Sequence, residues 1–138
     1  MKVPLRDTEK NGDRYLVRYY MEGFRQPQRD NVYDALIDLS NRVCIDFKEV
    51  LSINKVDNII HMKGPSMGAS CSMYIGRNSD GSPQTMKLGR GCIQLGIVQH
   101  EMLHALGMDH EHNRPDRDVQ WLNIEVNSQL EICLIPIF

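Results

Sequence analysis

The sequence lacks the features that would place it in several large classes of protein. No apolar run approaches the roughly 20 residues of a transmembrane helix. The first residues, MKVPLRDTEKNGDR, contain no apolar segment of the kind found in a secretory signal. Neither sign of charge is in excess, because the net charge is −2, so no nucleic-acid or acidic-membrane partner is indicated. Internal repeats and low-complexity segments are also absent from the sequence.

Two catalytic signatures are missing as well. The sequence has no G-x-S-x-G elbow of the kind that presents a nucleophilic serine. Its four cysteines form no C-x-x-C pair, which argues against a thiolate zinc site or a redox motif. With 138 residues and 41% hydrophobic composition, the chain suits one globular domain with its own core, and we expect a monomer.

One stretch contains the candidate functional residues: residues 100 to 110 read HEMLHALGMDH. His100 and His104 are separated by one helical turn, so both rings leave one face of a helix and can reach a single zinc ion. Glu101 lies beside the first ring, where a general base would act without being a ligand. These spacings predict a metal site on a helix.

The end of this stretch predicts a third ligand. Gly107 is the residue type that ends helices by taking a positive φ, and a turn there would bring His110 back to the same metal. Three protein ligands leave the fourth zinc position open to water, which is typical of catalytic rather than structural zinc sites.

The alternative interpretation is an exposed helix with histidines on its polar face. The flanking residues argue against it, because they make the helix apolar nearly all round, which predicts burial. Buried histidines and a buried glutamate need partners, and a shared metal supplies one. The apolar residues are Ile93, Leu95, Ile97, Val98, Met102, Leu103, Ala105 and Leu106.

The longer segment HEMLHALGMDHEHNRPDRD, from His100 to Asp118, resembles the astacin signature H-E-x-x-H-x-x-G-x-x-H-E-x-x-R-x-D-R-D. Three upstream segments also resemble the family: VCIDF at 43–47, CSMYIGR at 71–77 and GRGCI at 89–93. The resemblance covers roughly residues 13 to 129, so the chain is identified as similar to the astacin zinc metalloendopeptidases of the metzincin group.

Local patterns place the expected elements. Residues 15–21, 43–50 and 58–62 read as strands, with His61 as an ordinary strand residue. Residues 28–42 read as a helix whose apolar stripe is Val32, Ala35, Leu36 and Leu39. A strand at 92–95 should lead into the zinc helix at 97–106. Residues 63–91 read as turns on either side of a short CSMYIG strand.

The order of these elements lacks regular β-α-β alternation, so the fold class is expected to be α+β. The resemblance implies the same class: a twisted mixed sheet with two long helices, forming the upper subdomain of a metzincin-like zinc protease. We expect a polar arm at 1–14, a partial peptidase domain at 15–129 and a divergent apolar tail at 130–138. No Met follows Met108 and no Tyr follows Tyr74, so the family's methionine turn, its tyrosine ligand and most of the lower subdomain are expected to be missing.

The resemblance also implies that Cys71 and Cys92 form a disulfide. Closing that loop of about 22 residues would stabilise the fold by ~3 kcal/mol in the chain-entropy model. A disulfide implies an oxidising compartment, and with the family it implies a secreted, extracellular protein. The pairing of Cys44 stays open between Cys133 and a free thiol.

The expected function is hydrolysis of peptide bonds in protein or peptide substrates. One zinc ion held by the three histidines would activate water, and Glu101 would be the general base. The resemblance implies that Tyr74 with its neighbours would line the substrate cleft. The alternative is a truncated, non-catalytic zinc-binding pseudoenzyme or peptide-binding fragment.

Overall fold

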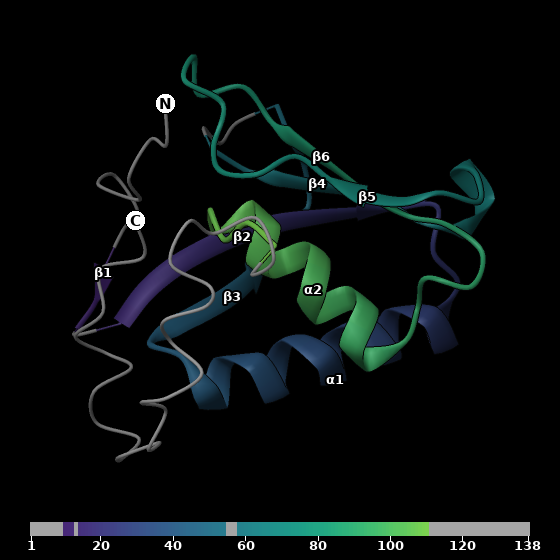
Figure 1. The fold of residues 1–138 in the computed structure, drawn as a ribbon, viewed down its shortest axis with the longest axis horizontal. Helices are drawn as coiled ribbons and strands as arrows, with labels where there is room; N and C mark the ends of the chain where they lie inside the picture. The colour runs from purple at the N-terminus through teal and green to yellow at the C-terminus, as the bar shows by residue number, and fades with distance from the viewer. Residues whose placement is uncertain (1–9, 13, 55–57, 111–138) are drawn as a thin grey trace.

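The structure, a computed structural model, describes residues 10–12, 14–54 and 58–110. These residues form six strands, two α-helices and one short 3-10 helix (Figure 1). In chain order the elements are β1 (Lys10–Asn11), β2 (Arg14–Glu22), α1 (Gln26–Arg42), β3 (Ile45–Glu49), β4 (Ile60–Lys63), η1 (Pro65–Met67), β5 (Cys71–Met73), β6 (Gln84–Leu88) and α2 (Leu95–Ala105).

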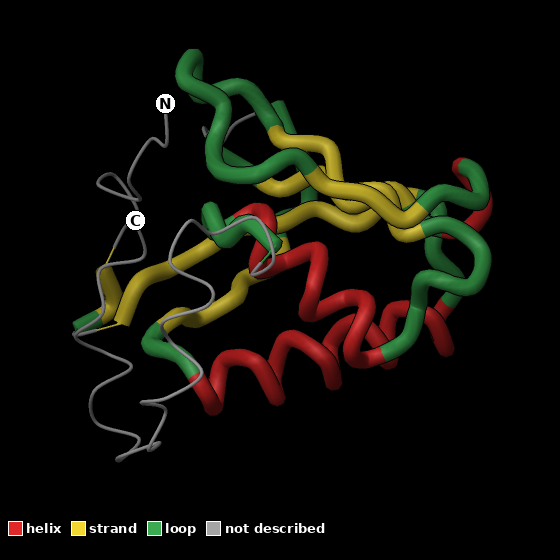
Figure 2. Tube along the Cα trace, in the orientation of Figure 1, coloured by secondary structure: helices red, strands yellow, loops and turns green. Residues whose placement is uncertain are grey.

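The strands form one mixed sheet in the order β1-β2-β4-β6-β5, with β3 also paired to β2. Strand β2 is parallel to β3 and β4, and β4 is parallel to β6, whereas β1 and β5 run antiparallel to their neighbours. Both helices lie on the same side of this twisted sheet (Figure 2). The α+β class with two helices on a mixed sheet is therefore confirmed.

The core lies between the sheet and the two helices. Alternate residues of β2, namely Val17, Tyr19 and Met21, are buried, as expected for a strand with one face on a core. The stripe predicted on α1 is buried in full. Helix α2 contributes Val98, Met102 and Ala105 to the same core. In the described part of the chain, no helix is both long and apolar enough to cross a bilayer.

One arginine, at the start of β2, joins three elements of the fold. The Arg14 guanidinium donates to Asp46 on β3 at 2.6 Å, to the backbone oxygen of Ser40 on α1 at 2.8 Å and to that of Val43 at 3.2 Å. Because a guanidinium offers five donors in a fixed plane, one side chain satisfies the carbonyls where α1 ends. This contact fixes α1 against the sheet.

Two strand predictions were wrong. Residues 92–94 form no strand, because Gly91 takes a φ of +85° and directs the chain into α2, which begins at Leu95. Conversely, β6 lies inside the segment predicted as turns. Its residues Gln84, Met86 and Leu88 are buried in alternation, a period-two signal that the surrounding Gly and Pro residues had obscured.

Other boundaries moved for local reasons. Strand β4 begins at Ile60, not residue 58, because Asn58 has a positive φ of 57°. Strand β5 ends at Met73, before the turn at Gly76. Helix α1 begins two residues earlier than predicted, with Pro27 in its first turn. Lys10–Asn11 pairs with β2 inside the segment predicted as a solvated arm, whereas the tail at 130–138 lies outside the described residues.

Candidate metal centre

Helix α2 and the loop after it bring three histidines together. His100 and His104 lie on one face of α2, and His110 follows five residues after the helix ends at Ala105. One ring nitrogen from each lies within 4.8 Å of the others. The Nε2 atom of His104 is 3.0 Å from that of His100 and 3.2 Å from that of His110. We call these three residues the histidine cluster.

A left-handed turn positions the third histidine. Gly107 has a φ of +99°, a conformation that side chains with a Cβ disfavour. Its N–H donates to the His104 carbonyl at 2.9 Å, and the Met108 N–H donates to the Leu103 carbonyl at 3.0 Å. These bonds satisfy the last carbonyls of α2 and reverse the chain toward His110.

The central imidazole of the cluster has a fixed tautomer. His104 is buried, and its Nδ1 lies 2.7 Å from the backbone oxygen of Met108. A carbonyl oxygen only accepts hydrogen bonds, so Nδ1 carries the proton. Nε2 of the neutral ring then presents a lone pair toward the other two rings. This is the arrangement by which proteins orient histidine ligands of metals.

The spacing of the nitrogens fits a zinc ion. Two nitrogens at the usual Zn–N distance in a tetrahedral site are about 3.3 Å apart. The two Nε2 separations measured from His104 are 3.0 and 3.2 Å. Hydrogen bonding within the cluster is a poorer account, because the single Nε2 lone pair of His104 would face two rings at once. The donor set therefore fits zinc with three imidazole ligands.

Glu101 lies next to His100 on α2. It is 7% exposed, and the ion pairs formed among the described residues do not include it. A carboxylate that is buried without a cationic partner is costly unless water, a metal or a proton stabilises it. The region next to the cluster therefore contains one buried carboxylate.

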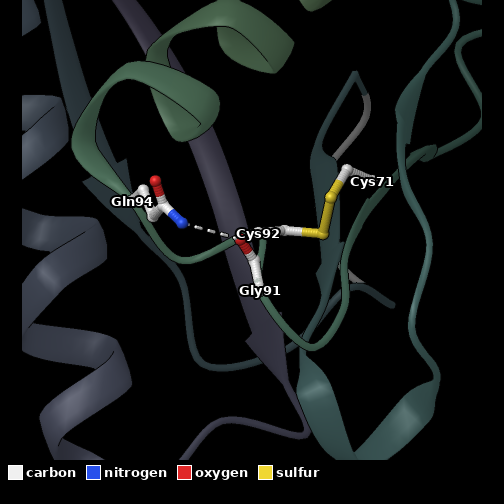
Figure 3. Close-up of a disulfide and its surroundings, with 4 residues drawn as sticks. All are labelled: Cys71, Gly91, Cys92 and Gln94. Carbon is white, nitrogen blue, oxygen red and sulfur yellow. Dashed lines mark hydrogen bonds between the residues drawn. A yellow bond between two sulfur atoms is a disulfide. The ribbon is translucent and has the colours of Figure 1, made fainter.

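Three contacts hold α2 in place. The Gln99 side chain donates to Asp38 on α1 at 2.7 Å and to the Ala35 carbonyl at 3.1 Å. The hydrogen bonds from Arg42 and then Gln99 hold the pKa of Asp38 below its usual range. At the start of α2, the Gln94 side chain donates to the Gly91 carbonyl at 3.3 Å (Figure 3).

A disulfide joins the sheet edge to the segment before α2. Cys71, the first residue of β5, is bonded to Cys92, as the resemblance implied (Figure 3). The bond lies at the opposite end of α2 from the histidine cluster. At the cluster end, the Gly76 N–H donates to the His104 carbonyl at 2.9 Å. The segment from Cys71 to Gly76, which begins with β5, is therefore attached at one end to the residues just before α2 and at the other end to α2 itself.

Tyr74, predicted to line the substrate cleft, directly follows β5. Its side chain is 85% exposed, and the next residue, Ile75, is 43% exposed. Both precede Gly76, whose N–H contacts α2. The structure therefore places exposed apolar side chains on the edge segment that runs toward the cluster.

The remaining predictions concern residues elsewhere in the fold and residues that the structure does not describe. His61 lies in β4, where its Nε2 is 2.7 Å from a Glu22 carboxylate oxygen, away from the cluster. Cys44 is not a free thiol, and its suggested partner Cys133 lies outside the described residues, as does the signature from Glu111 onward.

Sequence reasoning missed two features of the site. The carbonyl of Met108 orients His104, but a backbone contact leaves no residue-type signal. Gln99 was detectable in principle, because it is a polar residue on a largely buried helix and is not one of the predicted site residues. A half-buried polar side chain in that position indicates a hydrogen-bond partner on the neighbouring helix.

Comparison with known proteins agrees with this geometry. Residues 6–131 match the family described as Astacin, a family of peptidases. Astacin-like metalloprotease toxin 1 of Loxosceles intermedia is 33% identical over 121 residues, covering 80% of this chain and 43% of the relative. Zinc metalloproteinase nas-13 of Caenorhabditis elegans is 38% identical over 105 residues, covering 73% of this chain and 22% of the relative.

A solved structure is also similar to this chain. High choriolytic enzyme 1, a hatching enzyme zinc-protease from Oryzias latipes (Medaka fish), superposes with a TM-score of 0.66 at 26% identity. The match covers 96% of this chain and 66% of that one. The chain thus spans less than half the length of the two sequence relatives above and about two thirds of this structure.

Proposed function

We propose that this chain, which belongs to the astacin family of peptidases, carries the zinc-binding part of a metalloendopeptidase. The observation that supports the proposal most directly is the histidine cluster, whose three ring nitrogens lie within 4.8 Å of one another. His100, His104 and His110 would hold one zinc ion. A zinc ion held in this way makes a bound water acidic and polarises the scissile carbonyl.

Glu101 does the proton transfer in this mechanism. Its carboxylate accepts the proton of the attacking water and then donates it to the leaving amide nitrogen, so no covalent enzyme intermediate forms. Its burial supports the role, since a carboxylate in a site with little water interacts more strongly with a nearby proton donor. The hydrogen bond from His104 Nδ1 to Met108 keeps the ligand ring oriented throughout.

The edge of the sheet offers a place for a peptide substrate. Strand β5 pairs only with β6 in the described sheet, so its other edge keeps backbone donors and acceptors for an extended peptide. Tyr74 and Ile75 continue this edge toward His104 and would contact substrate side chains. The substrates we infer are therefore proteins or peptides bound in extended form.

The disulfide supports a location outside the reducing cytosol. Cys71–Cys92 joins β5 to the segment before α2, and such bonds persist mainly in oxidising compartments. We infer that the protein is secreted, as its family resemblance also implied.

The test compares zinc content and peptidase activity of the oxidised chain with those of Glu101→Gln. We expect one zinc per chain in both, and cleavage of a broad peptide mixture by the unmodified chain only, with activity of the variant lower by about 10²–10⁴-fold. Gly96→Ala serves as the control, because Gly96 lies on the same helix and has open space around it. A substitution at Gln99 would not serve, because its side chain bonds Asp38.

Each outcome has a definite meaning. Equal cleavage by the unmodified chain and the variant would remove Glu101 from the mechanism. Zinc binding without cleavage in either protein would favour the non-catalytic alternative for this chain. Absence of zinc binding would contradict the assignment of the histidine cluster as a metal centre.

A further inference from the structure

A pocket lies at the end of the sheet away from the histidine cluster. Its volume is about 470 Å³, within the range of ligand-binding pockets. The lining residues are Gly23, Arg25, Gln28, Pro65, Ser66 and Arg90. Gly23 and Arg90 lie just after β2 and β6, Pro65 and Ser66 belong to η1 after β4, and Gln28 lies in the first turn of α1. The strands β2, β4 and β6 are parallel, so their carboxyl ends lie at the same end of the sheet (Figure 1). Ligands of open sheets commonly bind at such an edge.

Backbone contacts hold the walls of this pocket. The Ser66 hydroxyl and N–H both donate to the Gly23 carbonyl, at 3.0 and 3.2 Å, and the Arg90 N–H donates to the Gly68 carbonyl at 3.2 Å. Gly23 has a φ of +80°, and a Cβ there would lie 2.6 Å from the Met67 side chain. The pocket is therefore formed before any ligand arrives, so binding requires little reorganisation.

The charged groups that line the pocket are both donors. Arg25 and Arg90 are exposed, and neither enters an ion pair within residues 10–12, 14–54 and 58–110. The side-chain oxygen of Gln28 already accepts the Arg25 N–H at 2.8 Å, which leaves its amide N–H groups for a ligand. No carboxylate is among the lining residues.

The carboxylates nearest in sequence have other partners. Glu22 lies 2.7 Å from His61, and Asp30 accepts a hydrogen bond from Gln26 at 2.8 Å. Neither lines the pocket. The pocket therefore presents two guanidinium groups and an amide that no acidic side chain within it neutralises.

We propose that this pocket binds neighbouring carboxylates of an acidic peptide segment. Guanidinium groups match carboxylates through two parallel N–H···O bonds. A peptide is favoured over a polysulfated chain because the pocket has only two cations, which match two neighbouring carboxylates and leave the many sulfates of such a chain without partners among the lining residues.

The acidic segment binds without occupying the metal centre. Arg90 precedes α2, whereas His104 lies near its other end, and the rise from Leu95 to His104 is about 14 Å at 1.5 Å per residue. The proposed site goes beyond the peptidase function and does not depend on zinc. On a protein substrate it would serve as a tether separate from the scissile bond.

The experiment measures binding of a fluorescein-labelled hexaglutamate peptide to the full chain by fluorescence anisotropy, beside a matched hexaglutamine peptide. We expect hexaglutamate to bind and hexaglutamine not to bind. Arg25→Gln and Arg90→Gln should each weaken binding about three- to fivefold, as is typical of exposed charge pairs, and the double variant should weaken it tenfold or more. Arg25→Lys should retain part of the affinity.

Arg42→Gln is the matched control. It removes one guanidinium at the other end of α1, next to Asp38, and should leave binding unchanged. Equal weakening by Arg42→Gln would mean non-specific attraction and would overturn the proposal, as would equal binding of the two peptides. Tighter, arginine-dependent binding of a sulfated heparin hexasaccharide would overturn the assignment to a peptide. Because no arm measures catalysis, these results are independent of the peptidase test.

Discussion

At the scale of single residues, the third member of the histidine cluster depends on Gly107. This glycine has a φ of +99°, and the turn it makes brings His110 within 3.2 Å of His104. A residue with a Cβ in this conformation is strained by about 1–2 kcal/mol. The least costly relief is a different end to α2, and this would move His110 away from the other two rings.

We therefore expect Gly107→Ala to weaken zinc binding by about 5- to 30-fold while the fold is kept, the factor that corresponds to this strain. Zinc affinity by competition with a chelating dye and helix content by circular dichroism would be measured together. Gly96→Ala is the control, because Gly96 lies on the same helix, has no positive φ and has open space around it. Equal zinc affinity in the two variants would show that His110 does not depend on this turn.

At the scale of elements, α2 is held to α1 by a hydrogen bond from Gln99 to Asp38, at 2.7 Å. The hydrogen bonds that Asp38 accepts lower its pKa in the folded state. An acid with a lowered folded pKa contributes stability above its unfolded pKa, about 3.9 for Asp, and loses it as pH falls through the folded pKa. The contribution is thus complete near neutral pH.

We expect Gln99→Ala to lower the free energy of unfolding at pH 7 by about 1–2 kcal/mol, because it removes both hydrogen bonds that Gln99 donates, to Asp38 and to the Ala35 carbonyl. Asp38→Asn should also destabilise the fold at pH 7, and its difference from the unmodified chain should shrink as the pH falls below 4. Urea unfolding across this pH range is the measurement. A difference for Asp38→Asn that does not change with pH would show that the charge of Asp38 is unimportant.

The same elements show how far the sequence predicts this structure. Helix α1 and strand β2 were predictable because their buried faces repeat regularly along the chain. The histidine spacing predicted that His100 and His104 lie together on α2, because a helix brings residues four apart to one face. Strand β6 was missed because five residues between turns carry few repeats, and its pairing with β4 comes from distant parts of the chain.

The pocket lined by Arg25 and Arg90 could not be predicted from the sequence for the same reason. Its residues come from three separate segments, and only the parallel pairing of β2, β4 and β6 brings them together. The orientation of His104 by the Met108 carbonyl is a backbone contact and carries no signal in residue type. Local sequence patterns therefore predicted individual elements and the helix face that carries the histidines. Contacts between elements could be found only from the folded structure.

At the scale of the whole molecule, zinc should be linked to folding stability. The three histidines converge only when α2 and the turn after it are formed, because an unfolded chain does not hold their ring nitrogens within 4.8 Å. A ligand that binds only the folded state stabilises it by RT ln(1 + [L]/Kd), about 2.7 kcal/mol at a concentration of 100 Kd. Metal binding should therefore raise the midpoint of thermal unfolding.

We expect the Tm of the chain to rise by several degrees when zinc is added after treatment with a chelator, since each kcal/mol corresponds to about 2–8 °C in a domain of this size. His104→Ala should abolish the rise, because it removes the histidine whose ring lies between the other two and leaves only two rings to bind zinc. His61→Gln is the control, since His61 is paired with Glu22 in β4 and should leave the rise intact. Calorimetry with and without zinc measures the Tm of the unmodified chain and of each variant. An equal rise in His104→Ala and the unmodified chain would mean that zinc stabilises the protein from another site.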